Sequence, residues 1–301
     1  MKIFVAGSLN MDLTIRAPYV PQKGETVKGE GFLVTPGGKG ANQAVACAKL
    51  GAETLMVGCI GNEFGEELVA SLQNCGADVG FVERKNEVSS GIAMIIVADG
   101  DNRIIIDRGA NAKVDRAIID SALREAEAGD LLIVQLEIET DTVCYALARA
   151  KERGMITLLN PAPAESLPAE VFADCDYFLP NQSEAKFYTG VYPENEESAK
   201  RCAAILREKG VKKTVITMGE RGSVCIGDKG FISVPAVKVK AVDTTAAGDT
   251  FIGAFATKLS EGADEEEAMR FANAAAAVTV TRRGAQTAIP SRIEADQMYK
   301  G

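Results

Sequence analysis

The sequence predicts an α/β fold in which helices cover both faces of a mostly parallel β-sheet. Two observations lead to this prediction. Short, continuously apolar runs alternate along the chain with amphipathic helical stretches, as expected for buried parallel strands joined by crossover helices. Polar residues follow several of these runs, at the carboxyl ends of the predicted strands, where open α/β sheets bind their ligands.

The predicted strands are short, and each lacks a polar face, so we expect them to be buried on both sides. They span residues 2–7, 54–60, 131–136, 155–159, 176–179 and 214–217. Two segments, 139–153 and 195–209, have the amphipathic pattern of helices, and Gly210 ends the second as a C-cap. Because no linker or repeat interrupts the chain, residues 1–301 are expected to form a single domain.

Two regions depart from the alternation and predict a small β-strand lid. Residues 12–36 contain two apolar runs separated by prolines and a glycine, and residues 91–107 have the pattern of a hairpin with its turn at 99–102. A flap of this size cannot bury both of its faces alone. We therefore expect it to lie over the active site and to pair with a second copy in a homodimer. A plain extension of the main sheet is the alternative.

Composition restricts both the chemistry and the partners. The chain has no histidine, which excludes a Ser-His-Asp triad and a His-ligated metal, so proton abstraction must fall to another side chain such as a carboxylate. A net charge of -9 argues against nucleic acid or a membrane surface as partner. The N-terminus lacks the pattern of a signal peptide, and no apolar run approaches membrane-spanning length, so we expect a cytoplasmic protein.

The segment 242–250 carries the strongest chemical signal. The small-residue loop Ala246, Ala247 and Gly248 directly precedes Asp249 and the apolar helical run 251–256. Backbone N–H groups of such a loop and the positive end of the helix dipole attract an anion. Asp249 would then be able to take a proton from a hydroxyl that attacks a phosphoryl group. The alternative is that Asp249 only stabilises the start of its helix.

A glycine-rich turn at 36–43 opens another predicted helix. Lys39 and Asn42 are three residues apart in its first turn and therefore point into the same space, while the glycines allow a ligand to approach the backbone. The spacing matches neither a Walker P-loop nor a G-x-G-x-x-G dinucleotide site. We expect Lys39 and Asn42 to grip a hydroxyl-rich ligand.

Polar residues that follow four of the apolar runs and close a fifth predict a shared cleft. Any one of them could be an ordinary turn or cap residue. Because the carboxyl ends of parallel strands meet at one edge of a sheet, several such residues are more readily explained by a common site. In chain order they are Asn10, Asp12, Glu137, Asn160, Asn181 and Thr217.

Taken together, these residues resemble the ribokinase-like (phosphofructokinase-B type) carbohydrate kinase family. The resemblance runs nearly end to end through the segments 7–12, 37–45, 160–164, 181–184, 217–222 and 243–250. It implies a ribokinase-like three-layer α/β/α sandwich with a small β-strand lid. It also implies Mg-ATP-dependent phosphorylation of a sugar, D-ribose on its 5-hydroxyl.

The resemblance assigns roles to particular residues. Asp249 would be the base, with the backbone of Ala246, Ala247 and Gly248 as the anion hole. The sugar would be held by Asn10, Asp12, Gly38, Lys39, Asn42 and Glu137. ATP would be held by Asn181, Thr217, Gly219, Gly222, Gly248 and Asn273. Asn181 and Glu184 would organise Mg²⁺ through water, in keeping with the preference of this ion for oxygen ligands and retained waters.

The resemblance further implies an activating monovalent cation such as K⁺. The matching positions are Asp243, Thr245, Thr279, Arg282, Gly284 and Ala288, several of which would offer only backbone carbonyls. Ala288 departs from the serine that the family often has, and it has no side-chain oxygen. Ala246 departs from the glycine of the wider family.

Other functions stay open at this point. One is a kinase for another sugar or a nucleoside, such as 2-deoxyribose or fructose, and another is a sugar or nucleotide sensor that has lost catalysis. Residue by residue, Asn273 could be an ordinary exposed helix residue and Glu137 a strand-end surface charge. Likewise, Asn181 could be a turn residue, Glu184 a helix first-turn charge and Arg282 a solvated helix end.

Overall fold

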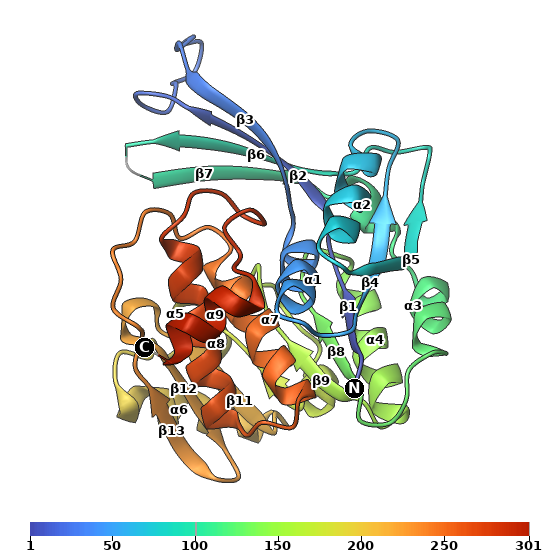
Figure 1. The fold of residues 1–301 in the computed structure, drawn as a ribbon, viewed down its shortest axis with the longest axis vertical. Helices are drawn as coiled ribbons and strands as arrows, with labels where there is room; N and C mark the ends of the chain where they lie inside the picture. The colour runs from blue at the N-terminus through green and yellow to red at the C-terminus, as the bar shows by residue number, and fades with distance from the viewer. Residues whose placement is uncertain (100, 301) are drawn as a thin grey trace.

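Two β-sheets organise the computed structural model, which describes residues 1–99 and 101–300 (Figure 1). The larger sheet has nine strands in the order β13-β12-β11-β10-β9-β8-β1-β4-β5, and the smaller has four in the order β3-β2-β6-β7. The larger sheet is parallel from β5 to β11, and β12 and β13 continue it as antiparallel strands. The predicted α/β fold with a mostly parallel sheet is confirmed.

All six predicted strands of the larger sheet are present, with ends shifted by at most two residues. They are β1 (Ile3–Ala6), β4 (Thr54–Ile60), β8 (Leu131–Val134), β9 (Ile156–Leu159), β10 (Tyr177–Phe178) and β11 (Lys213–Thr217). Three further strands, which the apolar pattern does not predict, lie towards the two ends of the sheet. They are β5 (Asp78–Arg84), β12 (Ser223–Gly227) and β13 (Gly230–Val234).

Helices cover both faces of the larger sheet and so form three layers. One face packs against α1 (Lys39–Lys49), α2 (Gly65–Asn74), α7 (Ala247–Ser260) and α8 (Glu265–Val280), with α9 (Arg292–Lys300) against α8. The other face packs against α3 (Arg116–Leu123), α4 (Thr140–Glu152), α5 (Gln182–Thr189) and α6 (Glu196–Glu208). Short 3₁₀ helices span Gly109–Lys113, Ala169–Asp174 and Gly219–Arg221. The two helices predicted at 139–153 and 195–209 are confirmed as α4 and α6.

Strand β1 shows why its run is apolar without a break. Successive side chains of a strand point to opposite faces. Ile3 and Val5 accordingly join the core under α1 and α7, whereas Phe4 and Ala6 join the core under α3 and α4. A polar residue at any of these positions would therefore be buried.

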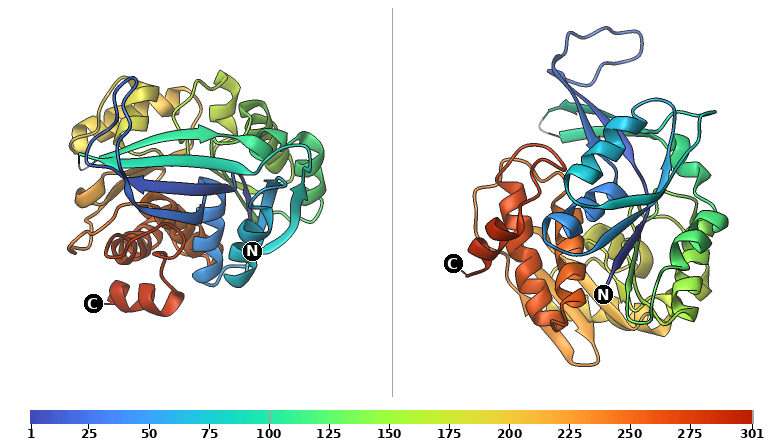
Figure 2. Two further views of the ribbon diagram at one scale, coloured as in Figure 1. Left: turned by 90° about the horizontal axis from the view of Figure 1, so that it is seen from above. Right: turned by 45° about the vertical axis from the view of Figure 1, so that its right-hand side comes forward.

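The smaller sheet consists of β2 (Asn10–Arg16), β3 (Glu30–Gly37), β6 (Gly91–Ala98) and β7 (Asp101–Asp107). It projects from the carboxyl-end side of β1 (Figure 1), and seen from above it lies across that end of the molecule (Figure 2, left). Gly100, in the predicted turn between β6 and β7, lies outside the described residues. In the part of the chain that is described, no helix has the length and apolar character needed to cross a membrane.

Candidate active site

The carboxyl ends of five neighbouring strands bring the polar residues of the predicted cleft to one edge. In the larger sheet, β11, β10, β9, β8 and β1 are consecutive neighbours. Thr217, Asn181, Asn160, Glu137 and Asn10 close or follow these strands in the same order. A parallel bridge joins Asn181 to Thr217 directly. Side chains far apart in the sequence therefore share one edge.

Glu137 is the centre of a buried cluster at this edge. Its Oε2 accepts hydrogen bonds from Ser8 Oγ at 2.5 Å, from Asn10 Nδ2 at 3.4 Å and from the backbone N of Lys39 at 3.1 Å. The side chain of Glu137 is buried, so its interpretation as a strand-end surface charge is wrong. Because these bonds all go to one oxygen, the other carboxylate oxygen is left to accept from a ligand.

Asn111 orients Asn10, and the sequence offers no sign of this role. The side chain of Asn111 accepts from Leu9 N at 2.9 Å and donates to Asn10 Oδ1 at 2.7 Å. Since the oxygen of Asn10 is held in this way, its amino group is directed to Glu137. Asn111 lies in a 3₁₀ helix that follows β7 rather than at the end of a parallel strand, and no motif includes it.

Glycines allow the start of α1 to lie directly against the β1–β2 segment. A Cβ at Gly40 would collide with the backbone of Gly7 and Ser8, and a Cβ at Gly37 would collide with the carboxylate of Asp12. Gly38 has φ +89°, a left-handed conformation that favours glycine. Close packing of backbone thus places Asp12, Lys39 and Asn42 around one space.

The electrostatics of this space are dominated by carboxylates. Burial, with contributions from Glu137 and Asp249, raises the pKa of Asp12 to about 7. Burial opposes the charge of Lys39, but Asp249, Glu137 and Glu184 together raise the pKa of this lysine. Acceptor-only carboxylates around one ammonium group suit a neutral ligand rich in hydroxyl groups.

Asp249 lies in the first turn of α7, and its carboxylate points to α1. Asn42 Nδ2 donates to Oδ2 at 3.0 Å, and Gln43 Nε2 donates to Oδ1 at 2.9 Å. The side chain is buried. An aspartate that served only its own helix would receive its hydrogen bonds from that helix, whereas those given to Asp249 come from another one.

The loop before Asp249 has the geometry of an anion site. Ala246 has φ 58° and ψ 9°, a left-handed conformation that costs a non-glycine residue about 1–2 kcal/mol. A glycine at this position would avoid the strain. The first N–H groups of a helix have no partner in the helix itself, and no heavy atom lies within 4 Å of the position that a Cβ of Gly248 would take. Of the N–H groups in the loop, that of Ala247 donates to the carbonyl of Thr244 at 3.2 Å. Those of Ala246 and Gly248 are left as donors, and the space at Gly248 gives room for an anion.

Asn181 and Glu184 hold each other at the start of α5. Asn181 Oδ1 accepts from Glu184 N at 2.9 Å, and Glu184 Oε2 accepts from Asn181 N at 2.8 Å, which completes a capping box. Asn181 Nδ2 also donates to Glu184 Oε1 at 2.8 Å. Burial raises the pKa of Glu184. With one carboxylate and one amide, the pair fits a Mg²⁺ ion that keeps its waters.

Gly222 and Asn273 fix the segment that follows β13. Asn273 is buried, which makes its interpretation as an exposed helix residue wrong. It donates to the carbonyls of Val234 and Pro235, each at 3.2 Å, and a Cβ at Gly222 would collide with the carbonyl of Val234. Thr217 and Gly219, the latter with φ +58°, lie shortly before Gly222 in the chain.

The predicted cation ligands divide into a connected group and a separate group. Asp243 accepts from Thr245 N at 2.9 Å and from Gly284 N at 3.0 Å, which joins the loop before α7 to the segment after α8. Thr279 Oγ1 donates to Thr250 instead, at 3.0 Å, and Arg282 pairs with Glu294. Ala288 is fully buried. The negative end of the α8 dipole and nearby carbonyls fit a monovalent cation. Across residues 1–99 and 101–300, no cluster of three or more His, Cys, Asp or Glu residues could hold a metal.

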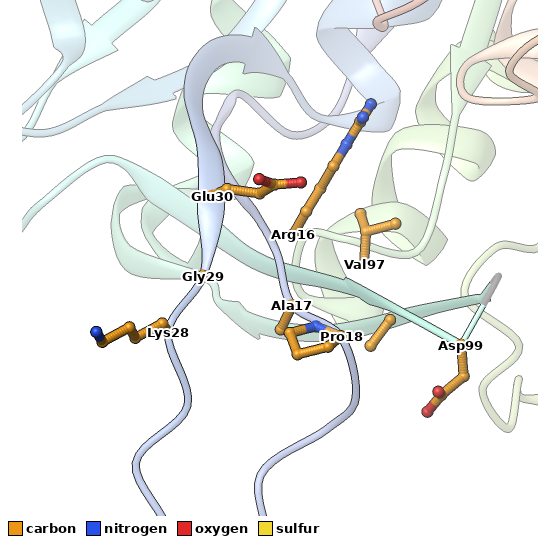
Figure 3. A pocket seen from close by; sticks show the side chains of 9 residues that line it. Arg16, Ala17, Pro18, Lys28, Gly29, Glu30, Val97 and Asp99 are labelled. Atoms are coloured by element: carbon orange, nitrogen blue, oxygen red, sulfur yellow. The ribbon is translucent and has the colours of Figure 1, made fainter.

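A hollow of about 580 Å³ lies at the outer end of the smaller sheet, away from these residues. In Figure 3, its charged side chains point in different directions rather than to a common centre; they belong to Arg16, Lys28, Glu30 and Asp99. None of the predicted site residues lines it. The predicted site residues therefore lie outside this hollow.

Comparison with known proteins identifies the family and agrees with the observed fold. The family described as pfkB family carbohydrate kinase matches residues 1–292. The chain belongs to this family.

A ribokinase of Schizosaccharomyces pombe is 42% identical, with 99% of this chain and 98% of the relative covered. A deoxyribokinase of Salmonella typhimurium is 38% identical, covering 97% and 96%. The structure of Arabidopsis thaliana ribokinase complexed with ribose and ATP superposes with a TM-score of 0.92 at 31% identity, covering 100% of this chain and 99% of that one. The family resemblance and the fold inferred from the sequence are confirmed.

Proposed function

We propose that this pfkB-family protein transfers the terminal phosphoryl group of ATP to O5 of D-ribose, giving D-ribose 5-phosphate and ADP. The observation that carries the proposal is the position of Asp249, a buried carboxylate beside the open N-terminus of α7. Full-length similarity to ribokinases supports the substrate.

The sugar would be held by Asn10, Asp12, Gly38, Lys39, Asn42 and Glu137. Carboxylates accept two or more hydroxyl donors, and Lys39 and the amides supply donors in return. Asn10 and Asp12 lie at the start of β2, so the smaller sheet would be a lid attached to the sugar site.

Asp249 would act as the base. As the O5–H proton passes to its carboxylate, O5 forms a bond to the γ-phosphorus, and the bond between that phosphorus and the ADP oxygen breaks. Backbone N–H groups of Ala246, Ala247 and Gly248 would stabilise the negative charge on the transferring group. Phosphoryl transfer depends mainly on such positioning and charge stabilisation.

ATP would lie along Asn181, Thr217, Gly219, Gly222, Gly248 and Asn273. Asn181 and Glu184 would hold Mg²⁺ through water, and the bound ion would neutralise the phosphates. A monovalent cation, K⁺ in our proposal, would be held by Asp243, Thr245, Thr279, Arg282, Gly284 and Ala288, with Ala288 offering only its carbonyl.

A second candidate is a kinase for 2-deoxyribose, favoured by the deoxyribokinases at 38% identity. The ribokinase and deoxyribokinase relatives give no such support to a kinase for fructose or a nucleoside. The non-catalytic sensor is disfavoured by the Asp249 carboxylate and the open donors beside it, which a sensor does not need.

A sugar panel distinguishes these functions. We expect kcat/KM to be highest for D-ribose and at least about 10²-fold lower for 2-deoxyribose, because a site that hydrogen-bonds a hydroxyl rejects the sugar that lacks it. The panel adds fructose and a nucleoside, each with saturating Mg-ATP, with and without K⁺. A preference for another sugar would show that D-ribose is not the substrate. Failure to form ADP with any of these sugars would favour the non-catalytic sensor. Turnover that does not respond to K⁺ would contradict the cation site alone.

We further propose that the lid forms a homodimer through its apolar face. Phe32, Met94 and Ile105 are exposed there, Ile105 by 70%, and an apolar surface of this kind is typical of an interface. Ile105→Lys is expected to raise the dimer dissociation constant by at least about 10-fold, as measured by sedimentation velocity. Ile293→Lys on α9 is the matched control, since Ile293 is exposed by 71%. A monomeric unmodified protein at micromolar concentration, or equal effects of the two variants, would contradict the proposal.

A further inference from the structure

Behind Asp249 lies a chain of buried side-chain amides. Gln43 Nε2 donates to Asp249 Oδ1 at 2.9 Å and to Asn160 Oδ1 at 3.1 Å, while Gln43 Oε1 accepts from Gln135 Nε2 at 2.6 Å. Asn160 Nδ2 in turn donates to the backbone carbonyl of Leu179 at 3.1 Å. We call Gln135, Gln43 and Asn160 the amide relay. Its members come from β8, α1 and β9 or from the residues that follow these elements.

The carbonyl of Leu179 fixes the direction of every bond in the amide relay. A backbone carbonyl can only accept, so the amino group of Asn160 must face it and the oxygen of Asn160 must face Gln43. Gln43 therefore presents its amino group to Asn160 and to the Asp249 carboxylate, which is also an acceptor. If the Gln43 amide were reversed, its oxygen would face two oxygens at once. The orientation follows from the chemistry of the acceptors, not from the placement of nitrogen and oxygen atoms.

Packing prevents the amide relay from rearranging. Gln43 and Gln135 are fully buried, and Asn160 nearly so. A Cβ at Gly7 would collide with Gln135 Oε1, which shows how closely this amide lies against the backbone of the β1 end. Breaking one bond would leave buried polar groups without partners, which is costly.

We infer that Gln43 is a positioning residue for Asp249, locked by Asn160 and Gln135 so that its amino group holds the carboxylate correctly aimed. This inference rests on the proposed role of Asp249 as the base. Asn42 holds the other oxygen, so the two amides of one helix turn grip both oxygens. The ionised carboxylate is the form that a proton acceptor needs, and hydrogen bonds to that form favour it.

Charged groups from three other elements also face Asp249. They are Lys39 at the start of α1, Asp12 on β2 and Glu184 on α5. A test must therefore change Gln43 and leave these groups in place.

Two substitutions of Gln43 separate its charge role from its packing role. Gln43→Met keeps the length of the side chain and removes the N–H donor, and Gln43→Glu keeps the shape and places a second carboxylate against Asp249. The matched control is Thr257→Val, which removes a buried hydrogen bond to Gly253 O two turns further along the same helix as Asp249. Folding of all variants is compared by circular dichroism and thermal unfolding.

The first readout is the pH dependence of kcat with ribose. We expect Gln43→Met to lower kcat at pH 7 by about 10- to 100-fold, with a much smaller change in ribose KM. In Gln43→Glu the acid limb of the profile should move by at least about one pH unit to higher pH, because two adjacent carboxylates cannot both ionise readily. Thr257→Val should match the unmodified protein.

The second readout needs no turnover. In protein labelled with ¹³C at the aspartate carboxyls, the Asp249 resonance is identified by its loss in Asp249→Asn and is titrated against pH. We expect it to titrate at higher pH in both Gln43 variants than in the unmodified protein. If the unmodified protein forms no ADP with ribose, the proposed function is refuted. The titration needs no turnover, so it would still test the role of the amide relay. If both Gln43 variants fold and leave the titration and the pH profile unchanged, the inference is overturned.

Discussion

Asp249→Asn is expected to lower kcat with ribose by about 10²–10⁴-fold, the usual contribution of a general base. The substitution keeps the shape of the side chain and the oxygen that can accept from Asn42 or Gln43, but an amide cannot take the O5 proton. Ribose affinity should change much less than kcat, because the other sugar-holding residues are untouched. Steady-state kinetics and calorimetric titration with ribose measure the two effects separately.

The matched control for this variant is Asp264→Asn. Asp264 also lies at the start of a helix, where it caps α8 by accepting from Glu267 N at 3.0 Å. Asparagine caps a helix about as well as aspartate, so kcat should not change. Near-normal turnover in Asp249→Asn would show that Asp249 is not the base.

Asp12→Asn is expected to weaken ribose binding and at the same time to stabilise the empty protein. Hydrogen bonds to a charged acceptor contribute about 1.5–3 kcal/mol, so loss of the carboxylate should raise the ribose Kd by about 10- to 150-fold. The carboxylate is also costly to keep ionised in the absence of sugar, because burial and the neighbouring Glu137 and Asp249 raise its pKa to about 7. Removing the charge removes that cost.

The pH dependence of this stabilisation has a definite sign. The pKa of Asp12 is higher in the folded protein than in the unfolded chain, where an aspartate has a pKa of about 3.9. The folded state therefore binds more protons between about pH 4 and pH 7, and Asp12 makes the protein less stable as pH rises through this window. A displacement of about three units corresponds to at most about 4 kcal/mol, and solvent around the half-buried side chain reduces it.

Thermal unfolding at two pH values tests this expectation. Asp12→Asn should melt at a higher temperature than the unmodified protein at pH 8, and the difference should vanish below about pH 4. Asp78→Asn, on the exposed edge strand β5, is the control and should show no such difference. A variant that is less stable at pH 8, or that binds ribose normally, would contradict the role given to Asp12.

The sequence predicts the larger sheet well where burial leaves an unbroken apolar run. This holds for the six strands from β1 to β11 that are covered on both faces. Strand β5 is missed because most of its side chains are at least partly exposed and polar residues interrupt it. The common edge of Asn10, Glu137 and Asn181 could be predicted because parallel strands end on the same side.

Contacts between distant side chains could not be predicted in the same way. Gln43 and Asp249 are 206 residues apart, and Asn111 and Asn10 are 101 apart, so no local pattern records either pair. The sequence could not show whether Asn273 is exposed. Small and apolar residues occur on several sides of α8, so the sequence pattern does not reveal which side of the helix is buried. Only the packed structure shows that its amide holds the segment after β13.

The position of the phosphorus in the product tests the central claim most directly. The unmodified protein is incubated with D-ribose and Mg-ATP, and the mixture is followed by ³¹P NMR with proton coupling. The account predicts ADP together with one new phosphomonoester signal, split into a triplet by the two protons on C5. A doublet from phosphate on C1, or no ribose-dependent ADP, would contradict it.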